Sequence, residues 1–327
     1  MTRVAVLMSY YNGDRYIKEQ IESILNQELT PETVLDLYVR DDGSPKSDLA
    51  VVKDYQAQGK LTLFQDPNCG VVRSFYTLME KVAGYDYYFF SDQDDVWLPE
   101  KVQTMVDEMK KWEGEPAVPV GVFSDLAIAD QDAKPTGVLM KHDDWAEFAG
   151  NPQKLSQASI ISNKVTGASF AFNQAARDAA VQLGEKIFCS TYMHDSTMAL
   201  LVTQQGKLVY LDQPLVYYRQ HGNNVIGYRK RKTMLDKVTD IKEIYKHKVT
   251  RLFEYYLIER QQPNRADRRF VEAEQMFTRR PLHSLVSAWH LRDDLYGPHL
   301  VSSELLFLFF GVPVVAKKQA ELSQLVG

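Results

Sequence analysis

Short apolar runs alternate with stretches of helical spacing along the first third of this 327-residue chain. After the first run and a polar turn, Ile17, Ile21 and Ile24 recur at the spacing of one helix face. The predicted strands are residues 3–8, 34–39, 61–64 and 87–90, with helices at residues 17–25, 46–58 and around 75–79. Strands that alternate with helices predict an α/β fold with a mostly parallel sheet, helices on both faces and right-handed crossovers.

The pattern becomes less regular after residue 97. The spacing predicts a helix at residues 99–112, strands at 118–123, 165–172, 208–211 and from 215 onward, and an irregular excursion at 130–160. From about residue 228 the apolar positions, among them Met234, Val238 and Ile241, follow helical spacing. We therefore expect an α/β domain at residues 1–227 and a helical C-terminal region at residues 228–327.

A dense acidic cluster ends the fourth predicted strand. Asp92, Asp94 and Asp95 follow directly on an aromatic run. The three other early strands also end in loops rich in Asn, Asp, Gly or Tyr, and parallel strands place such loops at one sheet edge, where open α/β sheets bind ligands. Carboxylates this close repel one another unless a cation lies among them, and oxygen ligands favour Mg²⁺ or Mn²⁺. The alternative is a solvated acidic loop ahead of a helix that starts at Pro99.

Composition narrows the protein class. Apolar residues make up 45% and charged residues 25% of the chain, as in ordinary globular proteins. The net charge of −5 argues against a nucleic-acid partner. Two cysteines and the absence of a long apolar N-terminal segment predict a cytoplasmic protein. No GxxxxGK[ST] or GxGxxG motif follows the first strand, so phosphate-loop and dinucleotide-binding folds lose their main support.

The C-terminal region carries its own charge pattern. Residues 228–251 contain nine Lys or Arg against three acids, and residues 305–316 are the most apolar segment. That segment falls short of the roughly 20 residues that span a bilayer. The basic tail at residues 228–280 is either a solvated helix face or a surface for anionic lipid or a lipid-diphosphate acceptor, with residues 305–316 dipping into the membrane interface. The same apolar segment could equally form a homodimer contact.

An ordered set of motifs over about residues 3–227 resembles the GT-A fold of nucleotide-sugar glycosyltransferases. Within these, the chain resembles the inverting family 2, and most of all the bacterial rhamnosyltransferases that build cell-wall or capsular polysaccharides. The matching motifs are Met8-Ser9-Tyr10-Tyr11-Asn12-Gly13, Arg40-Asp41-Asp42-Gly43-Ser44, Asn68-x-Gly70, Ser74-Phe75, Ser91-Asp92-Gln93-Asp94-Asp95-Val96-Trp97, Val165-Thr166-Gly167, His194-Asp195 and Tyr218-Arg219-Gln220-His221-Gly222-Asn223-Asn224.

The resemblance implies a nucleotide-sugar site. Tyr11 would stack on the pyrimidine ring, and Asp41 would accept a hydrogen bond from its N3–H. Asp92 would hold the ribose, and Arg219 the pyrophosphate. Arg73 would meet the base or a phosphate, unless it is an exposed helix charge. The neighbouring Asp42 is equally compatible with a structural role in its loop.

The resemblance also implies a metal site and a base. Asp94 and His221 would bind Mn²⁺ or Mg²⁺, with Asp95 as the other candidate ligand beside Asp94. Asp195 would be the general base that takes the proton of the acceptor hydroxyl, with a helix N-cap as the alternative reading.

Three further residues are expected to line the acceptor or sugar pocket. They are Gly167, His194 and Trp97. Ser196-Thr197 stands where relatives carry an aromatic pair after His-Asp, so acceptor recognition departs from the family pattern.

The reaction implied by the resemblance is transfer of L-rhamnose from dTDP-β-L-rhamnose, with inversion, to a hydroxyl of a lipid-linked glycan. A UDP-sugar donor of the glucose, galactose or GlcNAc type remains the main alternative. A metal-dependent phosphohydrolase or nucleotidyltransferase could use the same carboxylates, but it would need further acids or a lysine for a second metal or for phosphate.

Overall fold

The computed structural model of this chain describes most of its length. The described residues are 1–45, 47, 49–115, 117–140, 145–221, 241–261, 267–278, 286–287, 290–291 and 312–326. They belong to two compact units, one made of Met1–Ser156 and Val165–Tyr228, and the other of Gln157–Lys164 and Arg229–Gly327. Each unit is described below by itself.

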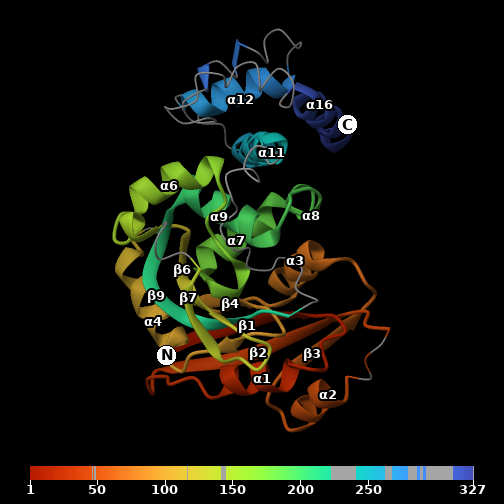
Figure 1. The fold of residues 1–327 in the computed structure, drawn as a ribbon, viewed down its shortest axis with the longest axis vertical. Coiled ribbons are helices and arrows are strands. Elements are labelled where there is room, and N and C mark those ends of the chain that lie inside the picture. The colour runs from red at the N-terminus through yellow and green to blue at the C-terminus, as the bar shows by residue number, and fades with distance from the viewer. Residues whose placement is uncertain are drawn as a thin grey trace. The chain divides into compact units, whose positions relative to one another are not determined.

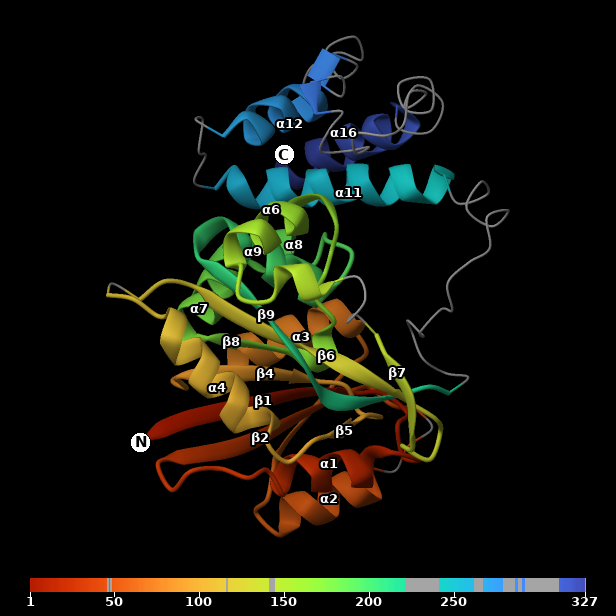
Figure 2. The same ribbon diagram turned by 60° about the vertical axis from the view of Figure 1, so that its left-hand side comes forward.

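The first unit is built on one mixed sheet, in which the longer ladders are parallel (Figures 1 and 2). The N-terminal strands are β1 (Thr2–Tyr10), β2 (Thr33–Asp42), β3 (Thr62–Asp66) and β4 (Tyr87–Ser91). They lie in the order β3-β2-β1-β4 and all run parallel, as the sequence predicts. Their carboxyl ends therefore meet at one edge of the sheet.

The other half of the sheet brings later residues to the same region. It contains β5 (Val96–Trp97), β6 (Val120–Ala129), β7 (Pro135–Leu139), β8 (Phe170–Asn173) and β9 (Lys207–Arg219). Strand β8 runs antiparallel to β4 and β6, and β9 runs parallel to β6. The short β5 directly follows the acidic loop and pairs with the end of β9. This pairing fastens the acidic loop to the segment that ends in His221.

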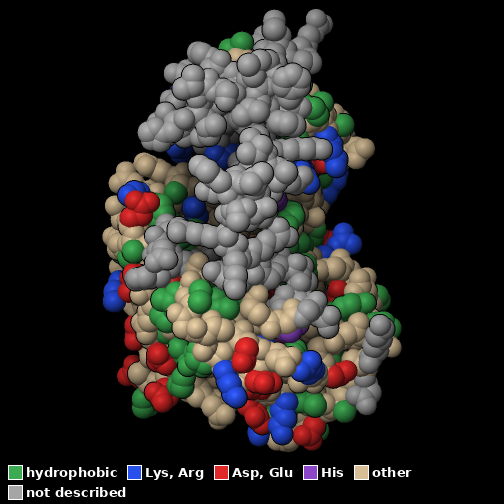
Figure 3. Space-filling view, in the orientation of Figure 1, with side chains coloured by type: hydrophobic (Ala, Val, Ile, Leu, Met, Phe, Trp, Pro, Cys, Tyr) green, Lys and Arg blue, Asp and Glu red, His purple; other side chains and the backbone are tan. Residues whose placement is uncertain are grey.

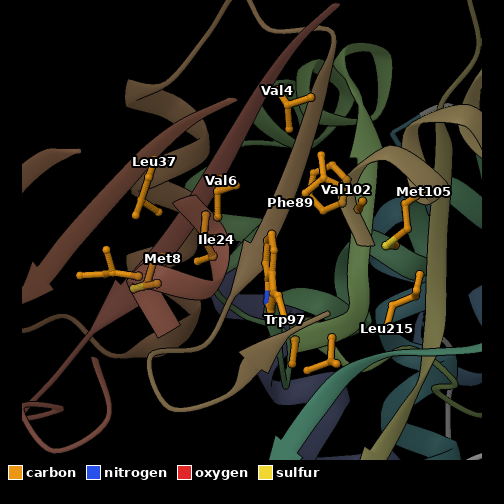
Figure 4. Close-up of a cluster of buried hydrophobic side chains, with 14 of the residues drawn as sticks. Val4, Val6, Met8, Ile24, Leu37, Phe89, Trp97, Val102, Met105 and Leu215 are labelled. Carbon is orange, nitrogen blue, oxygen red and sulfur yellow. The ribbon is translucent and has the colours of Figure 1, made fainter. Parts of the chain in front are cut away.

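Helices cover both faces of the sheet (Figure 2). The helices of this unit are α1 (Ile17–Leu25), α2 (Ala50–Ala57), α3 (Val71–Lys81), α4 (Lys101–Trp112), α7 (Gln174–Leu183), α8 (Glu185–Phe188) and α9 (His194–Gln205), with short 3-10 turns η1 (Ala146–Phe148) and η2 (Gly167–Ser169). Helix α6 (Pro152–Ile161) begins in this unit and ends in the second one. Alternation along β1 divides the core: Val4, Val6 and Met8 join the cluster on the side of α1, α2 and α4. Figure 4 shows Trp97 lying within this cluster.

The second unit is helical in the residues that the structure describes. Its helices are α11 (Ile241–Glu259), α12 (Arg268–Thr278) and α16 (Val312–Val326). Side chains 251–258 of α11 are all buried, and α12 and α16 both pack against this helix. Arg251, buried among them, donates hydrogen bonds to the Ser159 carbonyl. The three helices thus pack against one another.

Several predicted elements need correction. Residues 130–160 are not an irregular excursion, because β7, η1 and most of α6 lie there. Strand β6 continues beyond residues 124–125 to Ala129, and residues 165–172 form η2 before the short β8. The two apolar segments predicted near residues 208 and 215 are one long strand, β9. Sheet partners far along the chain decide these extents, so local periodicity did not show them.

Some predictions fall outside the described residues. These concern the motif end at residues 222–224, the helical spacing of Met234 and Val238, and residues 305–311 of the apolar segment. No helix in the described part of the chain combines the length and apolar character needed to cross a bilayer.

Acidic and basic side chains both reach the visible face of the first unit. Figure 3 shows them lying beside one another at the lower centre of this face.

Gly206, between α9 and β9, tests how closely the chain packs against Pro119. A Cβ atom at Gly206 would lie 1.7 Å from the Pro119 carbonyl oxygen, which also accepts the Lys207 N–H bond. We expect Gly206→Ala to lower the free energy of unfolding by about 3 kcal/mol or more, because backbone must move to admit the methyl group. Urea unfolding measures this loss. The control Gly59→Ala, at φ +70° in open space, should cost only about 1 kcal/mol, and equal losses would contradict the packing.

Candidate active site

The ends of β1 and β4 are joined through one glutamine side chain. The Tyr11 N–H donates to Gln93 Oε1 (2.7 Å), and Gln93 Nε2 donates to the Tyr11 carbonyl (3.1 Å). Gly13 is required beside this pair, since a Cβ there would lie 2.4 Å from the Gln93 amide. Tyr11, which is 46% exposed, is thereby held at the sheet edge. No role is predicted for Gln93 from the sequence, where its only signal is its place inside the acidic motif.

The two aspartates after β2 have different surroundings. Asp42 is buried and accepts the backbone N–H groups of Cys69 (2.8 Å) and Gly70 (3.0 Å). It also pairs with the Arg40 guanidinium at 2.6 Å. Asp42 therefore holds the loop that follows β3, which agrees with its structural reading. Asp41 accepts the Ser44 N–H (3.1 Å) through one oxygen.

Arg73 lies near the start of α3. Its side chain is half-exposed and makes an ion pair with Glu185 at 2.7 Å. The structure thus places it on the surface in contact with α8, and this exposed pair contributes little to stability.

The acidic loop brings carboxylates together at the end of β4. Burial raises the pKa of Asp92 to about 7, with Asp94 and Asp195 adding repulsion. Asp195, distant in sequence, is therefore close enough to Asp92 for their charges to interact. Burial also raises the pKa of Asp95 well above its usual range, and Asp94 and Asp92 reinforce the shift. A bound cation would relieve this repulsion.

Asp94 and Asp95 differ in accessibility. Asp94 reaches His221, with Oδ2 and Nε2 2.8 Å apart, and the His221 ring stacks on Tyr16 at 4.8 Å between centroids. Asp95 is 1% exposed and accepts the Arg219 N–H at 3.0 Å. Its second oxygen has no hydrogen-bond partner among the described residues. Asp94 is thus the one of the two that lies beside the histidine.

The donor set at this point suits a divalent ion only in part. Carboxylate oxygen and imidazole nitrogen are ligands that Mn²⁺ accepts. Within the described ranges, no group of three or more His, Cys, Asp or Glu side chains is arranged to hold a metal. Two protein ligands fit a cation whose remaining positions are taken by substrate phosphates and water.

The guanidinium of Arg219 is directed to internal partners. Arg219 is 1% exposed, and it donates to the carbonyls of Asp94 (2.6 Å) and Gln131 (2.7 Å). It also pairs with Glu19 and covers the Tyr16 ring. This burial does not suit the expected pyrophosphate contact; the arginine instead supports the acidic loop.

Asp195 lies in the first turn of α9. Met193 occupies the N-cap position, so the alternative reading of Asp195 as the cap does not apply. Its Oδ2 accepts the Gly167 N–H (2.8 Å) and its Oδ1 accepts the Ser196 N–H (2.6 Å). Backbone donors and the first turn of α9 both contact this carboxylate. The side chain is therefore fixed in orientation.

His194 is buried in an aromatic pocket. Its ring stacks on Phe75 at 3.9 Å between centroids and meets Phe90 edge-on. Burial lowers the pKa of the imidazole to about 3. A Cβ at Gly167 would lie 2.9 Å from His194 Nε2, so only glycine permits this approach. His194 and Gly167 thus lie beside Asp195, but the histidine faces the core.

Trp97 does not line a pocket. Its ring is buried in the apolar cluster between the sheet and α4, with Phe89 at 5.8 Å between centroids (Figure 4). The Lys101 Nζ atom lies 3.4 Å from the centre of the Trp97 ring. The expectation of an acceptor contact from Trp97 is therefore corrected to a core role.

The arrangement of this sheet and its helices defines a class: it is the GT-A glycosyltransferase fold. The structure resembles S. aureus TarS solved in complex with UDP-GlcNAc, with a TM-score of 0.52, 11% identity and coverage of 99% of this chain and 92% of that one. It also resembles the mannosyltransferase PcManGT of Pyrobaculum calidifontis in complex with GDP-Man and Mn²⁺, with a TM-score of 0.50, 15% identity and coverage of 99% and 85%. At these identities the likeness establishes the fold.

Sequence comparison identifies the family. Residues 5–123 match the model of glycosyl transferase family 2. The dTDP-rhamnosyl transferase RfbG of Shigella flexneri is 31% identical over 235 residues, which cover 67% of this chain and 73% of RfbG. An uncharacterized glycosyltransferase of Nostoc is 27% identical over 230 residues, 68% of this chain and 66% of that protein. The chain belongs to glycosyl transferase family 2, and it is a glycosyltransferase.

The buried imidazole predicts an acid sensitivity. The pKa of His194 is about 3 in the folded chain against 6.5 for a free ring, so between these values only the unfolded chain binds the proton. Stability is then full above pH 6.5 and falls as the pH drops, by about 1.4 kcal/mol per unit. Urea unfolding between pH 7.5 and 5.5 should show a steeper loss in the wild type than in His194→Phe. An equal pH dependence of the free energy of unfolding in the two proteins would contradict the role given to His194.

Proposed function

We propose that this glycosyltransferase moves L-rhamnose from dTDP-β-L-rhamnose to a hydroxyl group of a lipid-linked cell-wall or capsular glycan, with inversion at the anomeric carbon. The observation that carries the proposal is the meeting of Asp92, Asp94, His221 and Asp195 at one sheet edge. The donor is proposed because the Shigella relative is named a dTDP-rhamnosyl transferase.

The donor nucleotide would lie along the carboxyl ends of β1, β2 and β4. Tyr11 offers an exposed aromatic face to the pyrimidine, and Asp41, whose Oδ1 accepts the Ser44 N–H, would accept the base N3–H. Asp92 would accept a ribose hydroxyl. Arg73, on the adjacent helix, would exchange Glu185 for a donor phosphate.

Asp94 and His221 would hold a Mn²⁺ or Mg²⁺ ion together with the diphosphate oxygens. When bound, the ion supplies Lewis-acid stabilisation of the negative charge on the departing diphosphate. The internal contacts of Arg219 keep Asp94 in place, since its guanidinium donates to the Asp94 carbonyl.

Asp195 would act as the general base. Its two oxygens accept the Gly167 and Ser196 N–H groups, and these bonds hold the carboxylate in one orientation. The hydroxyl oxygen attacks the anomeric carbon opposite the diphosphate, and its proton passes to Asp195. The bond from the anomeric carbon to the diphosphate oxygen breaks with its electron pair, so a single displacement inverts the configuration.

A donor screen tests the sugar and the nucleotide together. Thermal unfolding is followed with dTDP-rhamnose, UDP-glucose, UDP-GlcNAc and GDP-mannose, each with and without Mn²⁺. A donor at 100 times its Kd stabilises the folded chain by about 2.7 kcal/mol. We expect dTDP-rhamnose with Mn²⁺ to raise the Tm most. A response to UDP-sugars alone would remove the rhamnosyl proposal and leave the family unchanged.

Replacing the base separates catalysis from binding. We expect Asp195→Asn to lower kcat by about 100-fold or more, because the amide cannot take the proton. The Tm rise with dTDP-rhamnose should stay as in the wild type. The assay follows dTDP release with a synthetic octyl glycoside that the wild type uses as acceptor. Asp178→Asn, on the exposed surface of α7, is the matched control. Normal turnover by Asp195→Asn would exclude it as the base.

A further inference from the structure

A lysine without an assigned role is buried beneath the candidate site. Lys101 begins α4, a few residues after the acidic loop, and its side chain is 0% exposed. Its Nζ atom donates a hydrogen bond to the Ala168 carbonyl at 2.7 Å and lies over the Trp97 ring. The Lys101 side chain therefore spans from the end of the acidic motif to the turn η2.

The turn η2 is also the support of Asp195. Gly167, one residue before Ala168, donates its N–H to Asp195 Oδ2 at 2.8 Å. The Ser169 N–H closes the turn on the Thr166 carbonyl at 3.0 Å. One three-residue turn thus receives the lysine on one side and holds the carboxylate on the other. A shift of this turn would move the hydrogen bond that orients Asp195.

A buried amine in this place is costly. Burial lowers the pKa of Lys101 well below its usual range, and the carboxylates of Asp95 and Asp92 only partly oppose that shift. A methionine of similar volume would fill the space without the desolvation cost. What methionine lacks is the N–H donor to Ala168. The geometry therefore gives the amine a specific task.

We infer that Lys101 is a positioning residue for Asp195: by holding the Ala168 carbonyl, it fixes the turn η2, whose Gly167 amide orients the carboxylate. This inference deepens the proposed function and rests on it for the role of Asp195. It links three motifs that are far apart in the sequence, the acidic loop with Trp97, the Thr166-Gly167 turn and the His194-Asp195 pair. In this assignment the Trp97 ring contacts the Lys101 amine.

A purely electrostatic role of the Lys101 amine can be distinguished from the positioning role by experiment. Lys101 could act only as a counter-charge for Asp92 and Asp95, in which case its removal would change Mn²⁺ and donor affinity. A positioning role instead changes turnover and leaves donor affinity as it is. A misplacement near 1 Å can cost up to about 100-fold in rate.

The experiment combines kinetics with hydrogen exchange on the full chain. Lys101→Met is compared with the wild type, with Lys101→Arg, which keeps a donor, and with Lys110→Met, an exposed lysine on the same helix. We expect Lys101→Met to lower kcat by about 10- to 100-fold with little change in the donor KM. Lys101→Arg should recover part of that rate, and Lys110→Met should behave as the wild type.

A double-mutant cycle identifies the residue through which the lysine acts. In the Asp195→Asn background, Lys101→Met should cause no further loss, because the group that it positions is already disabled. Equal losses in both backgrounds, or a loss confined to the donor KM, would overturn the inference.

Amide hydrogen exchange reads the turn without any activity. The peptide that contains residues 166–169 should exchange about 10-fold faster or more in Lys101→Met than in the wild type, and near the wild-type rate in Lys101→Arg. Unchanged exchange in Lys101→Met would overturn the inference even if no sugar is transferred.

If the wild type transfers no sugar but exchange rises as expected, the proposed function fails and the structural link remains. Should Lys101→Met not fold, Lys101→Arg decides: a kcat within about 10-fold of the wild type with near-wild-type exchange supports the link, and a larger loss of kcat with unchanged exchange refutes it.

Discussion

Negative charge gathered at one sheet edge is the constraint on which the rest of this structure depends. Asp92, Asp94 and Asp195 come from two distant segments, and their repulsion, together with burial, raises the pKa of Asp92 to about 7. Such a cluster has a use only when a cationic ligand occupies it or when one acid must accept a proton. The proposed sugar transfer would use both, since it stabilises a leaving diphosphate and deprotonates an acceptor.

The sheet supplies the rigidity that this charge requires. Strand β5 pairs with β9 immediately after the acidic loop, so the loop cannot move away from the segment that carries His221. Arg219 also connects β9 to the acidic loop: its backbone N–H donates to Asp95, and its guanidinium donates to the Asp94 carbonyl. Hydrogen bonds to charged groups in a buried setting are among the stronger polar interactions in proteins. The loop is therefore preorganised before any ligand binds.

Supporting residues around the site work through backbone groups. Gln93 holds the Tyr11 peptide, Asp42 holds the amides of Cys69 and Gly70, and Lys101 holds the Ala168 carbonyl. Each of these side chains fixes a loop that would otherwise pay a conformational entropy cost on binding. Gly13 and Gly167 complete the pattern, because neighbouring side chains occupy the space where a Cβ would lie. Tyr11, which we propose contacts the donor, is thus held through hydrogen bonds to its backbone.

The sequence by itself determined the N-terminal architecture. Periodicity is local, so the alternation of apolar runs and helical faces was enough to predict four parallel strands and the convergence of their loops. The ordered motifs were likewise sufficient to predict the family, which the comparisons confirm.

Only the tertiary structure decided the location and the partners of individual side chains. An aromatic residue after an acidic loop suits a sugar pocket and a core equally well, and packing against α4 placed Trp97 in the core. The same holds for Arg219 and Lys101, whose charges suggest solvent or phosphate until their distant partners Glu19, Gln131 and Ala168 are known. The physical reason is that burial and hydrogen-bond partners arise from contacts between residues far apart in the chain. A local sequence pattern does not predict these contacts.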